Sequence, residues 1–342
     1  MSKINYSIAI DAMGGENSPD KVIEGISLFL KNKNNNNFNF NIFGDKEKIL
    51  VSLKKFNIFS LPCYKIFHCT TKIEDKNSVR DAIRIGKDTS MWKAIESVKN
   101  KESDVIISSG NTGALLVISK LILKMIDGID KPALAGLWPN FKGTSIVLDL
   151  GANIDFSEKN YLDFSRIGAE LYRVIFKKAE PTVALLNVGS EEIKGHEELK
   201  NAFHTLQNLK NNFKFNGYIE GNQIKDGNTD VIITDGFAGN IALKTAEGTA
   251  NFITSEIKKI FSSSIFSKFC YMISYFLFEK IKKNLDPRKY NGGIFLGLNS
   301  LVIKSHGSAD AIAFYHSIKL TSQILEGNLI NIIKSNFDND KN

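Results

Sequence analysis

Five short turns, rich in glycine and small polar residues, carry most of the side chains that could do chemistry in this sequence. They read DAMGGENSP (11–19), ISSGNTGA (107–114), LDLGAN (148–153), NVGSEEIKG (187–195) and TDGFAGNIALK (234–244). One such turn alone is weak evidence, since glycine at a strand end often satisfies only backbone geometry. Each turn follows a short apolar stretch, and in parallel sheets ligands bind beyond the carboxyl ends of the strands. We therefore expect the five turns to lie at one edge of a sheet and to line one site.

The turn within IISSGNTGALL (106–116) has the chemistry of an anion site. Ser109 and Asn111 are candidate caps for a helix that begins at about Thr112 or Gly113. The free amides of a helix N-terminus favour a phosphate or a carboxylate. The alternative is a capped helix that binds nothing. Neither a Walker pattern nor GxGxxG is present in this stretch, so a nucleotide is not specifically indicated.

Two lysines and one histidine stand in similar turns. Lys194 lies in a glycine-bounded loop, where it could hold an anion or a developing oxyanion, although a solvated charged loop fits equally well. Lys304, Ser305 and His306 fall between an apolar strand and a helix, where the histidine could contact phosphate or move a proton. The patterns GxSxG and HExxH are missing, which disfavours a serine hydrolase or a zinc peptidase.

The elements that must position these turns alternate along the chain. Strand patterns cover 7–11, 38–43, 64–68, 105–108, 145–150, 182–187, 217–219 and 231–234, and helix patterns cover 18–31, 46–55, 88–99, 113–126, 158–178, 196–210 and 309–325. This alternation predicts an α/β fold with a mostly parallel sheet covered on both faces. No linker separates two halves, since the asparagine run at 34–37 is only a surface loop, so we expect a single domain over residues 1–342.

Composition excludes several other classes of protein. The chain of 342 residues is 43% hydrophobic and 24% charged, which is typical of a folded globular protein. Its net charge of +7 comes from lysines scattered through nearly every segment, whereas a nucleic-acid reader clusters them on one face. Cys63, Cys69 and Cys270 form no pair or zinc motif, so we expect reduced thiols and no metal. The N-terminus has no signal-peptide pattern, and we expect a cytoplasmic protein.

The segment 252–285 is unusually apolar and aromatic for a surface helix. Its longest uncharged run, 269–278, is about half of the roughly 20 residues that a membrane span needs. Lysines flank this run, which suits either a dimer interface or a helical tip that lies in the membrane surface. A pair of core helices is the alternative.

Taken together, the motifs resemble the PlsX-type phosphate acyltransferase family. The similar stretches are AIDAMGGE, SSGNTGA, LDLGAN, LLNVGSEEIKG, TDGFAGNIALKTAEG and GGIFLGLNSLVIKSHGSAD, in order from residue 9 to residue 310. One departure is Glu16, where the family usually has aspartate. The resemblance implies a Rossmann-like α/β/α sandwich related to phosphotransacetylases and to isocitrate and isopropylmalate dehydrogenases. It also implies a homodimer, with 252–285 as a protruding helical hairpin for dimerisation or membrane contact.

The implied reaction is acyl transfer from acyl-ACP (acyl carrier protein) to inorganic phosphate, without a cofactor. The acyl phosphate would pass to a membrane glycerol-3-phosphate acyltransferase, with the enzyme peripherally associated with the inner face of the cell membrane. Phosphate dianion is itself a nucleophile, so no covalent enzyme intermediate is required. Two alternatives remain: a phosphotransacetylase-like enzyme that uses acyl-CoA, and a non-enzymatic acyl- or lipid-binding protein.

For that reaction we expect different roles for different turns. Asn111, Thr112 and Gly113 would bind phosphate, and Lys194 and Lys304 would bind phosphate or the oxyanion. His306 would donate a proton or bind an anion. The remaining candidates for lining the site are Asp11, Gly14, Gly15, Ser109, Asn153, Asp235, Asn240 and Ser305.

Overall fold

The computed structural model describes residues 5–31, 35, 37–209, 212–276 and 286–339. Its strands are β1 (Tyr6–Asp11), β2 (Phe38–Gly44), β3 (Tyr64–His68), β4 (Val105–Ser108), β5 (Ala133–Asn140), β6 (Gly143–Leu148), β7 (Thr182–Leu186), β8 (Lys214–Ile219), β9 (Val231–Ile233), β10 (Gly293–Leu296) and β11 (Leu301–Lys304). Its α-helices are α1 (Asp20–Leu30), α2 (Lys46–Lys55), α3 (Val79–Ile85), α4 (Ser90–Lys99), α5 (Thr112–Leu123), α6 (Glu158–Phe176), α7 (Glu197–Asn208), α8 (Gly236–Ser262), α9 (Ile265–Ile273), α11 (Ala311–Glu326) and α12 (Leu329–Asn339). Short 3₁₀ turns are η2 (Gly86–Asp88), η3 (Gly221–Asp226) and η4 (Pro287–Tyr290).

The strands form one continuous 11-stranded sheet in the order β3-β2-β1-β4-β11-β10-β5-β6-β9-β7-β8. Strands β1 to β4 and β11 are parallel to one another, as are β6 to β9. The pairs β11–β10, β10–β5 and β5–β6 are antiparallel. The prediction of a mostly parallel sheet is therefore confirmed, with an antiparallel section in the middle.

That middle section reverses the direction of the second half of the sheet. Three successive antiparallel pairs separate β11 from β6, so β6, β9 and β7 run opposite to β1, β4 and β11. Their carboxyl ends consequently lie at the other edge of the sheet. The expectation that all five turns share one edge is wrong, because strands β5 and β10 were missing from the sequence pattern on which it rested.

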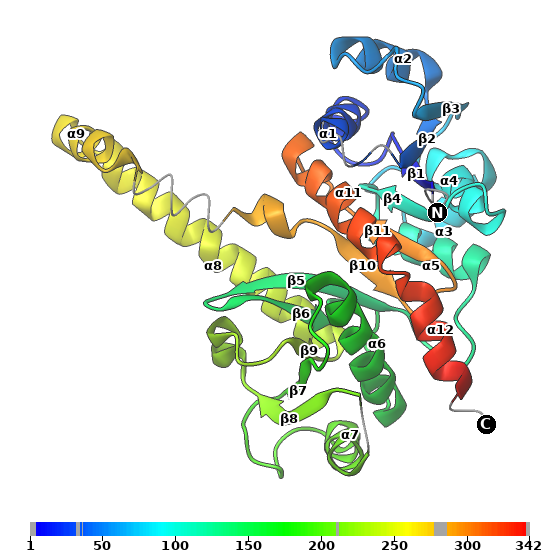
Figure 1. Cartoon of the computed structure of the whole chain (residues 1–342). Coiled ribbons are helices and arrows are strands. Elements are labelled where there is room, and N and C mark those ends of the chain that lie inside the picture. The colour runs from blue at the N-terminus through cyan, green and yellow to red at the C-terminus, as the bar shows by residue number, and fades with distance from the viewer. Residues whose placement is uncertain (1–4, 32–34, 36, 210–211, 277–285, 340–342) are drawn as a thin grey trace.

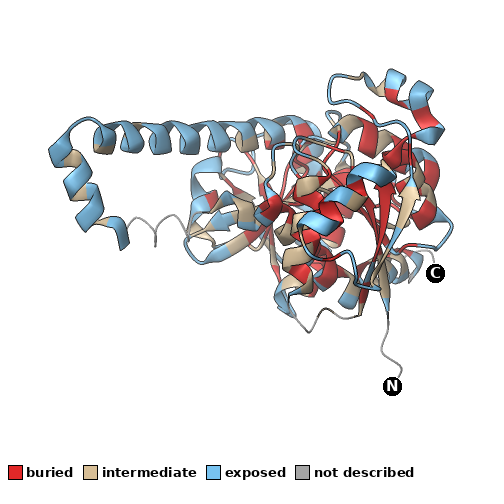
Figure 2. Cartoon of the chain, turned by 90° about the horizontal axis from the view of Figure 1, so that it is seen from above, coloured by how far each residue is buried: buried red, intermediate tan, exposed pale blue. Residues whose placement is uncertain are grey.

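Both faces of the sheet are buried under helices. Along β1, Ile8 and Ile10 face one core cluster, which includes residues of α1, α6 and α11, while Ala9 faces a second cluster with residues of α4 and α5. In β9, Ile232 packs into a third cluster, on the opposite face from Ile233. Figures 1 and 2 show these layers, with buried residues concentrated around the sheet. The predicted coverage of both faces is confirmed.

Most predicted elements exist, with boundaries shifted by a few residues. The predicted ranges 46–55, 64–68 and 105–108 match α2, β3 and β4. The sequence patterns did not predict α3, α12, β5 and β10. Part of the asparagine run at 34–37 lies outside the described residues.

Helices α8 and α9 form an arm that projects from the body, as Figure 2 shows. Helix α8 has 27 residues, which at 1.5 Å per residue makes it about 40 Å long, and it begins at Gly236 rather than near residue 252. No residue of α9 is buried, so the alternative of a core helix pair is wrong for the described part of the segment. Residues 277–285 of the predicted hairpin lie outside the described residues.

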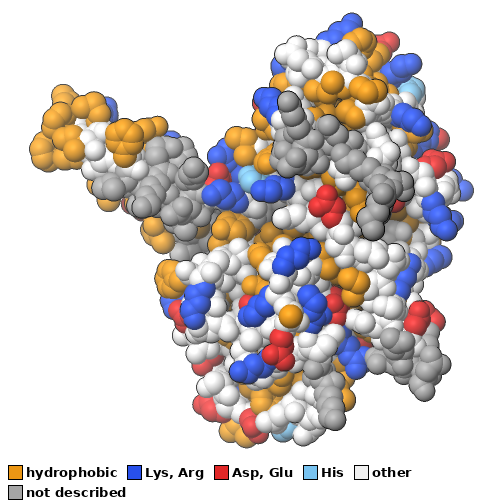
Figure 3. Space-filling model, viewed as in Figure 1, with side chains coloured by type: hydrophobic (Ala, Val, Ile, Leu, Met, Phe, Trp, Pro, Cys, Tyr) orange, Lys and Arg blue, Asp and Glu red, His pale blue; other side chains and the backbone are white. Residues whose placement is uncertain are grey.

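The tip of the arm exposes a group of apolar side chains (Figure 3). Ile265, Phe266 and Phe276 are 89%, 76% and 84% exposed. Helices in the described part of the chain lack the combination of length and apolar character that would let one cross a membrane.

Candidate functional site

Three neighbouring strands bring three of the predicted turns together. In the sheet register Asp11 lies opposite Ser108, and Ser108 lies opposite Lys304. The amide of Ser305 donates to the carbonyl of Ser108 at 2.9 Å, which ties the last turn to the middle one. We call the residues that gather at these strand ends (11–21, 108–113 and 304–308) the first-edge cluster.

Asp11 organises the base of this cluster. Its carboxylate is 2% exposed and accepts hydrogen bonds from the hydroxyls of Ser90 and Ser108, each at 2.7 Å. Both oxygens therefore already have partners within the protein. Asp11 therefore fixes the turn and is less available to a ligand.

Gly14 and Gly15 allow the turns to approach each other closely. A side chain at Gly14 would collide with the amide nitrogen of Gly110, only 2.5 Å away. Gly15 has φ +74°, and its missing Cβ would lie 2.7 Å from both the Gly307 carbonyl oxygen and Lys21 Nζ. Any other residue would force the first and last turns apart.

Lys304 places an ammonium group among backbone carbonyls at the end of β11. Its Nζ donates to the carbonyl oxygens of Ser305 and, at 3.4 Å, of Ser109. Burial lowers the pKa of Lys304 to about 8; Asp75 opposes the shift, and the charge of Lys21 adds to it. An anion in contact with this group would stabilise its charged form, which burial disfavours.

Lys21, in the first turn of α1, is a member of the cluster that sequence reasoning missed. It is 4% exposed, and its Nζ donates to the Gly307 carbonyl at 2.6 Å. Burial lowers its pKa. Nothing in NSPDKV distinguishes it from a surface lysine, since only the tertiary contact with residue 307 buries it.

The 109–113 turn begins α5 as predicted. Asn111 is the N-cap and accepts from the Ala114 amide at 2.9 Å, while its own amide group donates to the carbonyls of Asp75 and Asn77. Its side chain is thus engaged in structure. The amides of Thr112 and Gly113 belong to the first helical turn, where no intrahelical acceptor exists.

Ser109 adds a polar group without a partner. Its hydroxyl is buried and forms no hydrogen bond with any described residue. Buried hydroxyl groups in folded proteins nearly always have a partner. The one at Ser109 is therefore available to a ligand.

His306 lies at the exposed rim of the cluster. Its Nδ1 is 2.9 Å from the Ser308 hydroxyl, and its backbone amide donates to Asn291 at 3.0 Å. Partial burial and then the charge of Lys304 lower the pKa of His306, which Glu247 on α8 opposes. At neutral pH the ring is mainly neutral and able to exchange a proton. Asn291, which also donates to the Ser305 hydroxyl at 2.8 Å, is a positioning residue that the sequence did not reveal.

The remaining candidates lie at the other edge of the sheet. The carboxylate of Asp149 accepts from the backbone amides of Gly151, Ala152 and Asn153. The side-chain amide of Asn153 also donates to it, at 2.8 Å. Asp235 caps α8 by accepting from the Ala238 amide. Asn240 follows on α8, beside Gly151. These side chains shape loops and a helix start.

Lys194 is also part of this second edge. Its side chain is exposed, and its backbone is held by Asn187 and Glu191. Nearby, His196 Nε2 lies 3.1 Å from the Tyr161 hydroxyl and 4.0 Å from an oxygen of Asp235. Helix α8 links the two edges. Asp235 caps its start, and further along it Lys244 and Glu247 lie close enough to His306 to affect the pKa of that histidine.

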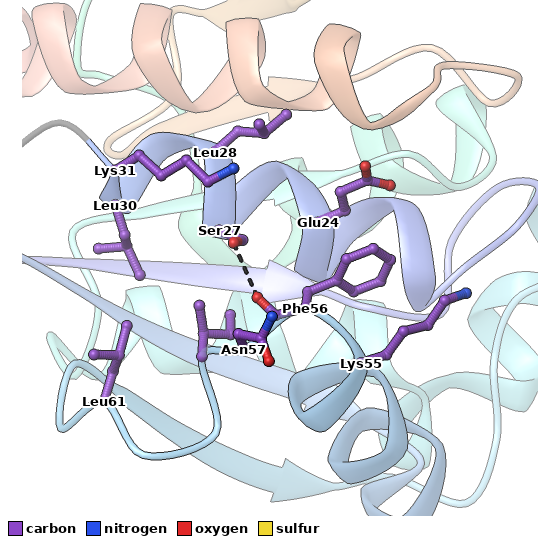
Figure 4. A pocket seen from close by; sticks show the side chains of 10 residues that line it. Glu24, Ser27, Leu28, Leu30, Lys31, Lys55, Phe56, Asn57 and Leu61 are labelled. Atoms are coloured by element: carbon purple, nitrogen blue, oxygen red, sulfur yellow. Dashed lines mark hydrogen bonds between the residues drawn. The ribbon is translucent and has the colours of Figure 1, made fainter.

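Some hollows on the surface contain none of the candidate site residues. Figure 4 shows one between α1 and the end of α2, lined by residues such as Glu24, Lys31 and Phe56. None of the candidate residues lines it. In the described ranges no three His, Cys, Asp or Glu side chains gather as metal ligands, and the three cysteines are free.

The chain is similar in sequence to a described protein family and to named proteins. Residues 6–332 match the family model described as "Fatty acid synthesis protein". A protein named phosphate acyltransferase from Pelagibacter ubique is 53% identical over 338 residues, covering 98% of this chain and 99% of the relative. A phosphate acyltransferase from Paramagnetospirillum magneticum is 39% identical, covering 97% of this chain and 94% of the relative.

Solved structures with low sequence identity share the fold. A EutD phosphotransacetylase from Staphylococcus aureus superimposes with a TM-score of 0.60 at 13% identity, covering 95% of this chain and 94% of that one. A branched-chain phosphotransacylase from Enterococcus faecalis V583 gives a TM-score of 0.57 at 14% identity, covering 93% and 98%. At such identities the likeness concerns the fold alone.

Proposed function

The chain belongs to the fatty acid synthesis protein family and is an acyltransferase of the phosphate acyltransferase type, and from this premise we propose that its acyl donor is acyl-ACP. A phosphate oxygen attacks the thioester carbonyl, the carbon–sulfur bond breaks, and acyl phosphate and the ACP thiol leave. The thiolate takes up one proton. No redox change occurs and no cofactor is needed.

One observation carries the placement of phosphate: a lysine, open helix amides and an unpartnered hydroxyl converge at the first edge. Lys304 Nζ approaches the Ser109 carbonyl, the Ser109 hydroxyl has no described partner, and the amides of Thr112 and Gly113 begin α5. A helix N-terminus with an adjacent cation suits a phosphate. Holding the phosphate beside the thioester would supply much of the rate acceleration.

The proton and the oxyanion need groups at the rim of this cluster. His306 is exposed, is mainly neutral because its pKa is lowered, and lies against Ser308, so we assign it the transfer of the proton from the attacking hydrogen phosphate to the leaving thiolate. Lys304 would stabilise the phosphate and the oxyanion. The strand directions separate Lys194, Asn153, Asp235 and Asn240 from this point, so we assign them to the acyl donor instead of phosphate.

An enzyme that uses acyl-CoA is the second candidate, because the fold is shared with phosphotransacetylases. Incubating the protein with phosphate and either acyl-ACP or acyl-CoA, with hydroxylamine to trap acyl phosphate, separates the two. We expect hydroxamate from acyl-ACP. Product from acyl-CoA alone would favour the second candidate, and no product from either donor would leave a non-enzymatic acyl-binding protein.

We also infer a role for the arm. Its exposed apolar tip would lie in the inner surface of the cell membrane or pair with a second copy in a homodimer, and a membrane glycerol-3-phosphate acyltransferase would consume the product there. The continuous sheet supports a single domain over residues 1–342. The relation to isocitrate and isopropylmalate dehydrogenases and the hairpin form of 252–285 remain part of this proposal.

A further inference from the structure

Lys21 places a buried ammonium group near that of the half-buried Lys304. The missing Cβ of Gly15 would lie 2.7 Å from Lys21 Nζ and 3.0 Å from the Cβ of Ser109. Lys304 Nζ in turn approaches the carbonyl oxygen of that same serine. Two cations and one hydroxyl therefore surround the point where the 14–16 and 108–110 turns meet.

Neither cation has an ion-pairing partner within the described residues. The salt bridges among them include no carboxylate that pairs with Lys21 or Lys304. Asp11, a buried acid of the same cluster, already accepts from Ser90 and Ser108. Glu16 raises the pKa of Lys21 and Asp75 raises that of both lysines, but both acids are exposed and no salt bridge among the described residues joins them to either lysine.

Such an arrangement is unfavourable in the unliganded protein. Burying a charge without a partner is costly, and two like charges close together add repulsion. The unpartnered hydroxyl of Ser109 adds a third unsatisfied group at the same point. A single ligand that is doubly negative and rich in acceptor oxygens would satisfy all three at once.

We propose that Lys21 is a second phosphate-binding lysine, which holds inorganic phosphate as the dianion together with Lys304 and the hydroxyl of Ser109. This inference rests on the proposed function. The bond from Lys21 to the Gly307 carbonyl orients the ammonium and joins α1 to the turn that carries His306. Phosphate bound there lies next to the rim where the thioester must enter.

The test measures equilibrium binding of radiolabelled inorganic phosphate and the steady-state KM for phosphate with the full-length protein. Lys21→Met keeps the aliphatic stem and removes the charge, and we expect at least tenfold weaker phosphate binding with an unchanged KM for the acyl donor. The matched control is Lys31→Met, an exposed lysine at the end of the same helix, which should bind phosphate normally.

Ser109→Ala separates ligand binding from folding. Because the hydroxyl has no described partner, its removal should leave the melting temperature unchanged while phosphate binding weakens several-fold. This variant decides the question if Lys21→Met fails to fold.

Three results would overturn the inference. Normal phosphate binding by both variants would do so, as would no phosphate binding by the wild-type protein. A purely structural Lys21 would lower the melting temperature and kcat but leave the phosphate KM unchanged. If phosphate binding depended on Lys21 but no acyl phosphate formed from any donor, the proposed function would fail while this inference stood.

Discussion

At the end of β11, the ammonium group of Lys304 depends on its surroundings for its charge. Carbonyl oxygens accept hydrogen bonds from it, burial lowers its pKa to about 8, and Lys21 adds a second positive charge nearby. Asp11 and Asp75 oppose the shift without pairing with it. The charge of Lys304 is therefore sensitive to pH within the range in which enzymes are usually assayed.

The pKa of Lys304 predicts how phosphate binding varies with pH. Below pH 8 Lys304 of the free enzyme carries the charge, so the affinity for the phosphate dianion is at full strength. Above pH 8 the proton must be taken up with the ligand, and affinity should fall by up to about tenfold per pH unit. The check is the KM between pH 6.5 and pH 9.5, expressed as the concentration of phosphate dianion at each pH.

Lys304→Arg is the control for this pH dependence. Arginine stays charged throughout this range, so the phosphate KM of the variant should rise less above pH 8, even if the geometry of arginine weakens binding overall. An equal rise of the phosphate KM above pH 8 in the variant and the wild-type protein would show that another group titrates.

At the scale of elements, the start of α5 is fixed by the side chain of Asn111. Asn111 caps the helix through Ala114 and also holds the 75–77 loop through two backbone carbonyls. The same residue thus fixes the direction of the helix amides and keeps Asp75 near the two lysines. A helix start of this kind depends on its cap for geometry as much as for stability.

Removal of the cap should separate these two effects. Asn111→Ala should lower the free energy of unfolding by about 1 kcal/mol or more and weaken phosphate binding. Asn111→Ser restores a cap acceptor but is too short to hold the 75–77 loop, so it should recover most of the stability and less of the binding. Urea unfolding and the phosphate KM provide the two readouts, and full recovery of both would mean that the loop contact is unimportant.

The arm is the element whose function is most separable from the body. Ile265→Ser combined with Phe266→Ser should abolish co-sedimentation with anionic liposomes, because both side chains are exposed at the tip. Stability should change by less than about 0.5 kcal/mol, as is usual for exposed sites.

Phe141→Ser provides the matched control for the arm, since Phe141 is 81% exposed but lies on the body between β5 and β6. It should retain liposome binding. If the wild-type protein ignores liposomes, only the dimer interface remains, and the same double variant should then lower the apparent mass on size exclusion.

At the scale of the whole molecule, the antiparallel section joins two oppositely directed halves into one sheet. Strands β10 and β5 pair across the junction at Ile294, Phe295 and Leu296. The main core cluster includes residues from both halves, such as Ile8 and Ile233. The two halves should therefore unfold together.

The only two tryptophans allow a direct test of this cooperativity. Trp92 lies on α4 in one half, and Trp138 lies on β5 beside the third cluster. Trp92→Phe and Trp138→Phe each leave one fluorescent reporter, and after correction for each variant's stability measured by circular dichroism, each reporter should follow the global transition. A fluorescence transition that departs from the circular dichroism curve of the same variant would reveal two domains.

The sequence by itself determined the local structure and the list of reactive turns. Apolar periodicity fixed β3, β4 and α2, and turn composition identified Gly15, Asn111 and Lys304, because these signals act over a few neighbouring residues. Motif order was enough to indicate the family. The short β10 strand and β5, which contains Pro139 and a glycine, gave no such local signal.

Only the tertiary structure decided which turns share a site. The direction of each strand depends on pairing between residues far apart in the chain, and the missed antiparallel strands place Lys194 and Asp235 at the edge opposite Lys304. Burial of Lys21 likewise depends on Gly307, which lies 286 residues further along the chain. A pattern read along the sequence contains no information about such contacts, because the free energy of burying a charge is set by what surrounds it in space.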